Sequence, residues 1–195
     1  MGTRDQLLDE AEFLFARSSV AGVTTREITE AAGQRNTSAI SYHFGSREGL
    51  LLELLARRGG PIDAARGRCR SELDEVPPLR DLVACLVVPY CEMLSSPRGR
   101  SYLRIVAQLR GRFANWKVES DAATSQHLAS VLGEIEARAS FAPSVGEERT
   151  MALITVITSA TAERARRIDD EQQPALAHAE FVANLTDMCT ALMGG

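Results

Sequence analysis

The apolar positions of the chain recur at helical spacing from one end to the other. Near the N-terminus, Leu7, Ala11 and Leu14 share one face of a helix that should begin at Thr3, where Thr3-x-x-Gln6 has the form of a capping box. Strand-like alternation of apolar and polar residues is not found in the sequence. The pattern predicts an all-α protein of about nine helices.

A second helix is predicted to begin at Thr24. Thr24 and Glu27 have capping-box spacing, and Val23 and Ile28 flank them at the positions of a hydrophobic staple. Gly33 can adopt the left-handed conformation that ends a helix, so this helix should stop there. Three local signals therefore agree on one short helix.

A third short helix follows closely. Asn36 or Thr37 is expected to cap it, and Ile40 and Phe44 should be buried one turn apart. A fourth helix should open at Ser46.

Glycine and proline mark the remaining breaks. The run 59–61, Gly-Gly-Pro, is expected to kink or break the fourth helix, because proline disfavours helical geometry in the residue before it. Further helices are predicted over residues 79–95, 97–112, 121–140, 145–169 and 175–193.

Two short helices joined by a tight turn form a helix-turn-helix pattern, in which the second helix can enter the major groove of DNA. Side chains on its outer face must be short, or flat and able to hydrogen bond. Phosphate-binding groups are expected on either side of it, at the start of the second helix and at the start of the fourth. The candidate DNA-binding residues are Thr25, Arg26, Asn36, Thr37, Ser38, Ser41, Tyr42, His43 and Arg47.

Each of these residues has a simpler interpretation by itself. Paired short helices with a glycine between them occur in many helical bundles. Tyr42 alone is more often a tyrosine at the edge of a core, and Arg47 alone is usually a solvated charge. The polar outer face of the third helix beside a strictly apolar inner face favours the DNA-binding interpretation.

Composition limits the alternatives. The 195 residues carry a net charge of -4, so contact with DNA must come from a local patch. The four cysteines have no zinc-site spacing and are interpreted as reduced thiols, and no metal or cofactor is expected. No signal peptide is recognisable, and the most apolar stretch, 82–94, is too short to span a bilayer. A soluble, cytoplasmic protein without a membrane partner is predicted.

The first quarter of the chain also resembles a known family. From Leu7 to Leu55 it is similar to the DNA-binding domain of the tetracycline-repressor (TetR) family. The residues that carry the resemblance are Ala11, Phe15, Gly22, Thr24, Thr25, Ile28, Ala31, Ala32, Gly33, Tyr42, His43, Phe44, Ser46, Arg47, Glu48 and Leu50. Two departures are visible: the turn after Gly33 is about one residue longer than the family's commonest turn, and Tyr42 falls one position later than its most frequent tyrosine.

The resemblance implies a helix-turn-helix DNA-binding domain over residues 1–56 and a ligand-binding and dimerisation bundle over 57–195. Residues 151–161 are apolar nearly all round, which is typical of a helix covered on both sides. The last helix carries a stripe of Val182, Leu185, Met188 and Leu192. A homodimer through the last two helices is expected; the alternative is that both helices fill the core of a monomer.

A ligand pocket is expected near Pro89, because a proline inside a helix bends its axis and opens space beside it. Aromatic and soft apolar side chains with a few polar tips could line it. The candidate ligand-binding residues are Tyr90, Cys91, Met93, Tyr102, Phe113, Trp116, Ile154 and Thr158. Ordinary core packing is the alternative for each of them. The arginines of the 97–112 helix are interpreted mostly as solvated surface.

The sequence therefore predicts a ligand-responsive transcription regulator. Such a protein, most often a repressor in the family it resembles, would bind a partly palindromic double-stranded DNA operator as a homodimer. A small, largely apolar effector would release it. One alternative is a dimeric helical protein that binds a small molecule and has lost DNA binding. An enzyme is not expected, since the three histidines lie in separate segments and no metal-binding or phosphate-loop motif is present.

Overall fold

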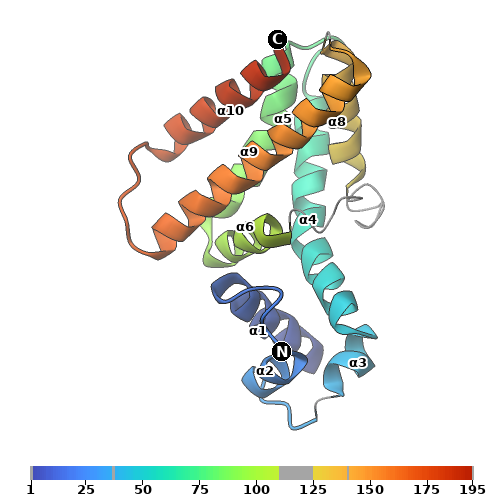
Figure 1. The fold of residues 1–195 in the computed structure, drawn as a ribbon, viewed down its shortest axis with the longest axis vertical. Coiled ribbons are helices and arrows are strands. Elements are labelled where there is room, and N and C mark those ends of the chain that lie inside the picture. The colour runs from blue at the N-terminus through green and yellow to red at the C-terminus, as the bar shows by residue number, and fades with distance from the viewer. Residues whose placement is uncertain (1, 37, 110–124, 140, 195) are drawn as a thin grey trace.

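The computed structural model describes residues 2–36, 38–109, 125–139 and 141–194. Within these residues the chain forms nine α-helices and one short 3-10 helix, and no strand, which confirms the all-α class (Figure 1). The elements are α1 (Thr3–Arg17), α2 (Thr25–Ala31), α3 (Ala39–Phe44), α4 (Arg47–Ser71), α5 (Leu79–Cys91), η1 (Glu92–Ser95), α6 (Pro97–Leu109), α8 (Gln126–Arg138), α9 (Pro143–Asp169) and α10 (His178–Gly194).

The helices gather into a small head and a larger body. Helices α1, α2 and α3 form the head at one end of the molecule, and α4 runs from α3 up into the body (Figure 1). The body contains α5, α8, α9 and α10, and α6 lies between it and α1 (Figure 1). Head and body each have an apolar core. Leu55 of α4 packs against both cores, and Ile105 and Leu109 of α6 are buried in the core of the head.

Local signals decide the ends of the head helices. The capping box at Thr24 is confirmed: the Thr24 hydroxyl accepts a hydrogen bond from the Glu27 backbone N–H at 3.2 Å, and the Glu27 carboxylate accepts one from the Thr24 N–H at 2.7 Å. Gly33 ends α2 with a φ of 67°, as predicted. Helix α1 does begin at Thr3, but the capping box expected there is wrong, because the N-cap is Gly2 and no side chain caps the helix.

Of the kink or break predicted at residues 59–61, the break is wrong, since α4 is continuous from Arg47 to Ser71 with Pro61 inside it, and the kink stays a prediction. Leu54 before the run and Ile62 after it are both buried, so packing on either side holds the helix together. Pro61 lies on the exposed side of the helix, where the carbonyl that loses its partner can be hydrated. Gly59 lets the Tyr102 hydroxyl approach closely, 3.3 Å from where a Cβ would stand. The domain limit at residue 56 falls inside this helix and stays a prediction.

The body helices follow the predicted order with shifted ends. The segment expected to be one helix over 79–95 is α5 followed by the 3-10 turn η1, and the buried Pro89 lies in the last turn of α5. Helix α9 begins two residues earlier than expected, with Pro143 in its first turn, where proline is favoured. Helix α10 begins three residues later than expected, at His178. The expected start of a helix at 121 lies outside the described residues.

Candidate nucleic-acid interface and its link to the body

The turn between α2 and α3 is built by Asn36. Its Oδ1 accepts hydrogen bonds from the Ser38 backbone N–H at 2.9 Å and from the Ser38 hydroxyl at 2.8 Å. The N-cap of α3 is Ser38, whereas Asn36 or Thr37 was predicted. Thr37 lies outside the described residues. The Asn36 side chain orders the turn through Ser38.

The outer face of α3 is polar and open. Ser38 and Ser41 are exposed, and Tyr42 is 84% exposed, whereas Ile40 on the inner face is 1% exposed. The Tyr42 ring meets the ring of His43 edge-on, with centroids 5.0 Å apart. The structure therefore brings four of the predicted base-reading residues onto one short helix above a buried inner side.

At the start of α2, Thr25 is half-buried and Arg26 points to solvent. The Arg26 guanidinium makes an exposed ion pair with Glu30 at 2.7 Å, and this hydrogen bond raises the pKa of Arg26. Such an exposed pair contributes little to stability. A phosphate oxygen can replace the Glu30 carboxylate beside Arg26 at small cost.

Arg47, predicted to bind a phosphate, instead has partners inside the head. Its Nε and one terminal nitrogen donate to the carbonyl of Val23 at 3.2 and 2.9 Å, and that nitrogen also donates to the carbonyl of Val20. The guanidinium carbon stands 5.1 Å from the centroid of the Phe15 ring. Arg47 thus fastens the start of α4 to the loop between α1 and α2, a role that the sequence did not reveal.

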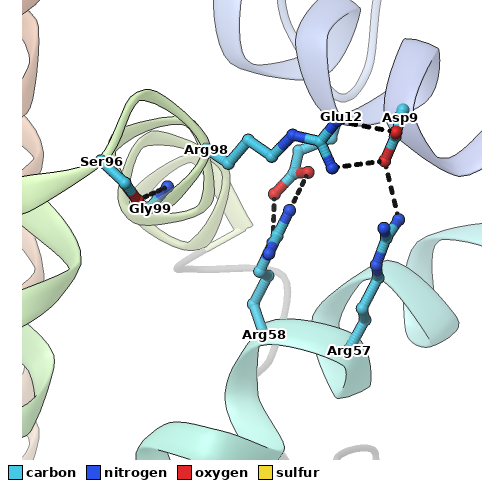
Figure 2. A network of polar contacts seen from close by, with 7 residues as sticks. All are labelled: Asp9, Glu12, Arg57, Arg58, Ser96, Arg98 and Gly99. Carbon is cyan, nitrogen blue, oxygen red and sulfur yellow. Dashed lines mark hydrogen bonds and ion pairs between the residues drawn. The ribbon is translucent and has the colours of Figure 1, made fainter.

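A network of charged side chains joins the head to the body (Figure 2). Arg58 of α4 donates two hydrogen bonds, each 2.9 Å, to the two carboxylate oxygens of Glu12, which is buried on α1. The Glu12 hydrogen bonds raise the pKa of Arg58. Asp9, one turn before Glu12, accepts from Arg57 of α4 at 2.8 Å and from Arg98 of α6.

A glutamine adds a second link between the same helices. The Gln108 amide on α6 donates to the carbonyl of Phe15 at 3.0 Å and accepts from the backbone N–H of Val20 at 2.7 Å. The oxygen and the nitrogen of one amide side chain therefore provide hydrogen-bond partners for two backbone groups near the end of α1. A cleft of about 390 Å³ opens beside these links, between α1, α6 and the end of α9.

The arginines of α6 are engaged more than expected. Arg100 and Arg104 both reach Asp169 at the end of α9, at 2.5 and 3.4 Å, and each is largely buried. The interpretation of these two as solvated surface is wrong. Partners more than sixty positions away in the chain give no local sequence signal, so sequence reasoning missed them.

The candidate ligand residues that the structure describes gather in the body. Tyr90, Cys91 and Tyr102 are buried in its core, with Met93 and Ile154 packed against it, and the Tyr90 and Tyr102 rings meet edge-on at 6.4 Å. Thr158 is buried as well, and its hydroxyl is used within α9, donating to the Ile154 carbonyl at 2.7 Å. Burial raises the pKa of the Cys91 thiol to about 12. Phe113 and Trp116 lie outside the described residues.

Sequence reasoning missed two charged residues in the same region. Asp63 and Arg66 lie on the inner side of α4, one turn apart, and both are buried. The expected break at 59–61 hid them, since it removed the helical register that places both residues on the buried side. With an unbroken helix through residues 59–61, an acid at position 63 and an arginine at position 66 would have fallen one turn apart on the buried side, and that arrangement would have indicated them.

In the described chain, the last two helices leave one side uncovered. Leu153 and Ile157 of α9 are buried, but Met151 is 46% exposed and Thr155 is exposed one turn further on. On α10, Met188 is 50% exposed. Leu185, which was placed in the outward stripe, is instead buried in the body's own core, so the stripe is narrower than predicted.

Within the described ranges, no group of three or more histidine, cysteine, aspartate or glutamate side chains could hold a metal ion. None of the helices described is long and apolar enough to cross a membrane.

Comparison with known proteins identifies the class of protein. Residues 7–54 match the family model described as bacterial regulatory proteins, tetR family. Over the whole chain, the fold is similar to a TetR-family transcription regulator from Shewanella sp. PV-4, with 16% identity, coverage of 99% of this chain and 98% of that one, and a TM-score of 0.69. No curated protein matches the sequence significantly.

Two other solved structures are similar over nearly their full length. NalD, described as the secondary repressor of the MexAB-OprM multidrug efflux pump in Pseudomonas aeruginosa, has 20% identity, coverage of 98% and 95%, and a TM-score of 0.65. The fatty acid degradation regulator FadR from Bacillus halodurans has 16% identity, coverage of 100% and 96%, and a TM-score of 0.61. These likenesses show the fold.

The family resemblance seen in the sequence is thereby confirmed. The head is a tetR-family DNA-binding domain, and the chain has the fold of TetR-family regulators from end to end.

Proposed function

We propose that the protein is a homodimeric transcription repressor that a small, largely apolar ligand releases from its operator, and that it acts in the cytoplasm. The observation that carries this proposal is the polar, exposed face of α3, with Tyr42 standing out from it above the buried Ile40. A short helix of this kind fits the major groove, where small and flat polar side chains reach the edges of bases.

The contacts with DNA divide between base readers and phosphate binders. Ser38, Ser41, Tyr42 and His43 read bases from α3. Thr25 and Arg26 bind phosphate from the start of α2, Asn36 lies in the turn between the two helices, and Thr37, which follows Asn36 in the sequence, is kept as a DNA contact. Arg47 is kept as a phosphate contact at the start of α4, and its hydrogen bonds to the Val23 carbonyl hold it at that place.

Two heads are needed to read a partly palindromic operator, and the uncovered side of α9 and α10 supplies a joint between copies. Met151 on α9 and Met188 on α10 are exposed large apolar side chains. Covering them in a partner removes apolar surface from water, which favours association. A dimer places two copies of α3 about one helical turn of DNA apart, or a small multiple of it.

The effector is assigned to the body, where the aromatic pair Tyr90 and Tyr102 lies close to α4. Helix α4 connects that region of the body with α3 in the head. A ligand that favours one position of α4 therefore changes the position of α3. Of the similar proteins, one is described as a fatty acid degradation regulator and another as a repressor of a multidrug efflux pump. Both descriptions agree with an apolar effector for this chain.

The test is selection of bound sequences from a random duplex pool, followed by mobility shifts with the recovered site. A partly palindromic sequence bound by two chains is expected, with affinity that falls as salt rises. Recovery of no enriched palindrome rejects the proposal. If the protein is a stable dimer that binds small molecules without binding any duplex, it is the carrier that lost DNA binding.

A further inference from the structure

A buried arginine in the body lacks the partners that a charge of this kind needs. Arg66 of α4 is 9% exposed, and no group among the described residues accepts a hydrogen bond from its Nε. Its ion pair is a long contact of 3.8 Å to Asp63. Burial lowers the pKa of Arg66, which reflects how poorly its charge is compensated. An incompletely paired charge in a protein interior is costly and is unusual without a purpose.

Asp63 faces Arg66 only through that long contact, because both of its carboxylate oxygens accept hydrogen bonds from another helix. One oxygen accepts from the backbone N–H of His127 at 2.9 Å, and the other accepts from that of Leu128 at 2.8 Å. Both N–H groups belong to the first turn of α8, where unsatisfied donors and the helix dipole favour a negative charge. The Asp63 carboxylate thus binds the start of α8, and the Arg66 Nε–H is left without a hydrogen-bond acceptor among the described residues.

The walls around Arg66 are aromatic and apolar. Its guanidinium carbon lies 6.0 Å from the centroid of the Tyr90 ring, and Ile62 is buried one turn earlier on α4. The charge of Arg66 acts on Tyr102 as well, where it opposes the rise in the Tyr102 pKa that burial causes. A guanidinium with an unpartnered Nε–H among such side chains suits a ligand with a carboxylate at one end and an apolar remainder.

We propose that Arg66 binds the carboxylate of the effector, so that the ligand of this regulator is a small amphipathic carboxylic acid in its ionised form. The inference rests on the proposed function, in which binding of a ligand releases the protein from DNA. It narrows the class of effector from a largely apolar molecule to one that also carries a carboxylate. The apolar remainder of the acid lies against Tyr90 and Tyr102. The carboxylate accepts the hydrogen bond for which the Arg66 Nε–H has no partner among the described residues.

The test is calorimetric titration of the full-length protein, without DNA, using octanoate, decanoate and phenylbutyrate. The matched controls are the primary amides of the same acids, which keep the shape and remove the charge. At least one acid is expected to bind about tenfold or more tightly than its amide, since hydrogen bonds to charged groups are the strong ones. Equal binding of acid and amide, or binding of none of the three acids, overturns the proposal.

Variants on α4 locate the effect. Arg66→Met should remove the preference for the acid over the amide, and Arg66→Lys should retain part of it. Arg68→Met, a change at an exposed arginine of the same helix, should leave the preference intact. An Arg66→Met protein that still prefers the acid as strongly as the unaltered protein refutes the assignment. If that variant does not fold, comparison of acid and amide on the unaltered and Arg66→Lys proteins decides.

Titrations without DNA separate this inference from the function on which it rests. A protein that prefers the acid but binds no operator fails as a repressor and keeps its carboxylate site. A protein that binds its operator but shows no preference for the acid keeps the repressor function and loses the site. Addition of the preferred acid to the operator complex should weaken DNA binding by the factor by which DNA weakens acid binding.

Discussion

Arg98 on α6 holds both carboxylate oxygens of Asp9 on α1, with nitrogen–oxygen distances of 3.1 and 2.9 Å. The same carboxylate accepts from Arg57 on α4 at 2.8 Å, and its side chain is mostly buried. One side chain of the head is thus bound to two helices that reach the body (Figure 2). Head and body are linked by directional contacts in addition to apolar packing.

Removing the charge of Asp9 should therefore loosen the head. Asp9→Asn keeps the size of the side chain and weakens three hydrogen bonds, so it should lower the free energy of unfolding by about 1–3 kcal/mol. Urea denaturation measures the change. The control is Glu10→Gln on the same helix, a residue for which no ion pair is seen among the described residues, and it should have little effect. Equal effects of the two substitutions would contradict a specific link through Asp9.

Thr24→Ala should destabilise the head through loss of the capping box. Three hydrogen bonds join Thr24 and Glu27, two of them through the Thr24 hydroxyl, and losing an N-cap side chain costs about 1 kcal/mol. The backbone N–H and the hydroxyl of Thr24 both lower the pKa of Glu27; the variant keeps the first and loses the second, so this carboxylate should titrate somewhat closer to its usual pKa. Chemical denaturation and an NMR pH titration of Glu27 measure the two effects.

Thr3→Ala is the matched control, because the Thr3 side chain caps nothing although the sequence around it has the same spacing. Its effect on stability should be close to zero. A loss at Thr3 as large as that at Thr24 would show that the difference between the two helix starts is unimportant.

Tyr42→Ala should separate recognition from folding. The ring is exposed, so its loss should change stability by no more than about 0.5 kcal/mol. If Tyr42 contacts a base, the preference at that base should change by about 1–3 kcal/mol. Repeating the sequence selection with the variant measures this change. Tyr42→Phe tests the hydroxyl alone, and an unchanged selection with both variants removes Tyr42 from the set of base readers.

Substitution of Arg47 and of Arg26 should differ in the effect on the stability of the head. Arg47→Ala removes the hydrogen bonds to Val23 and the contact with Phe15, so it should destabilise the head by about 1–3 kcal/mol. Arg26→Ala removes only an exposed pair with Glu30 and should change stability by less than about 1 kcal/mol. In mobility shifts, Arg26→Ala should reduce the salt dependence of binding. A stable Arg47→Ala protein with reduced salt dependence would show that Arg47 binds phosphate and does not hold the head together.

The buried thiols should react slowly. Burial raises the pKa of Cys85 and Cys91 to about 12 and that of Cys189 to about 11, from an ordinary value of 9.0. A raised pKa means less thiolate at any pH below it, and thiolate is the reactive form. Labelling by a disulfide reagent near neutral pH should therefore be slow in the native protein and should accelerate as pH rises. In denaturant all the cysteines should react at once; equally fast labelling of the native protein would contradict the burial.

The head was largely predictable because its signals act over a few residues. The capping box at Thr24 and the left-handed Gly33 each depend on neighbours within one or two turns. The hydrophobic staple with Val23 pointed to Ile28, and helical spacing placed Ile40 in the core; both are buried. Phe44, which was expected to be buried with Ile40, is only half-buried. The polar face of α3 followed from the same spacing.

The links between head and body were not predictable in this way. Asp9 and Arg98 are separated by 89 positions, and Glu12 and Arg58 by 46, so only the packed fold brings them together. One wrong prediction also affected others. Because a break was expected before Ile62, the helical register of the second half of α4 was not used, and the buried Arg66 was missed. Local propensity favoured a break there, and tertiary packing on both sides outweighed it.

The unbroken α4 makes the regulator sensitive to small rotations. Its 25 residues form a lever arm of about 37 Å. A tilt of about 5° at the upper end carries the lower end, where α3 is attached, through about 3 Å, which is close to the rise of one base pair along DNA. In the proposed dimer, a ligand that shifts Arg66 slightly would therefore displace both copies of α3 relative to the major groove.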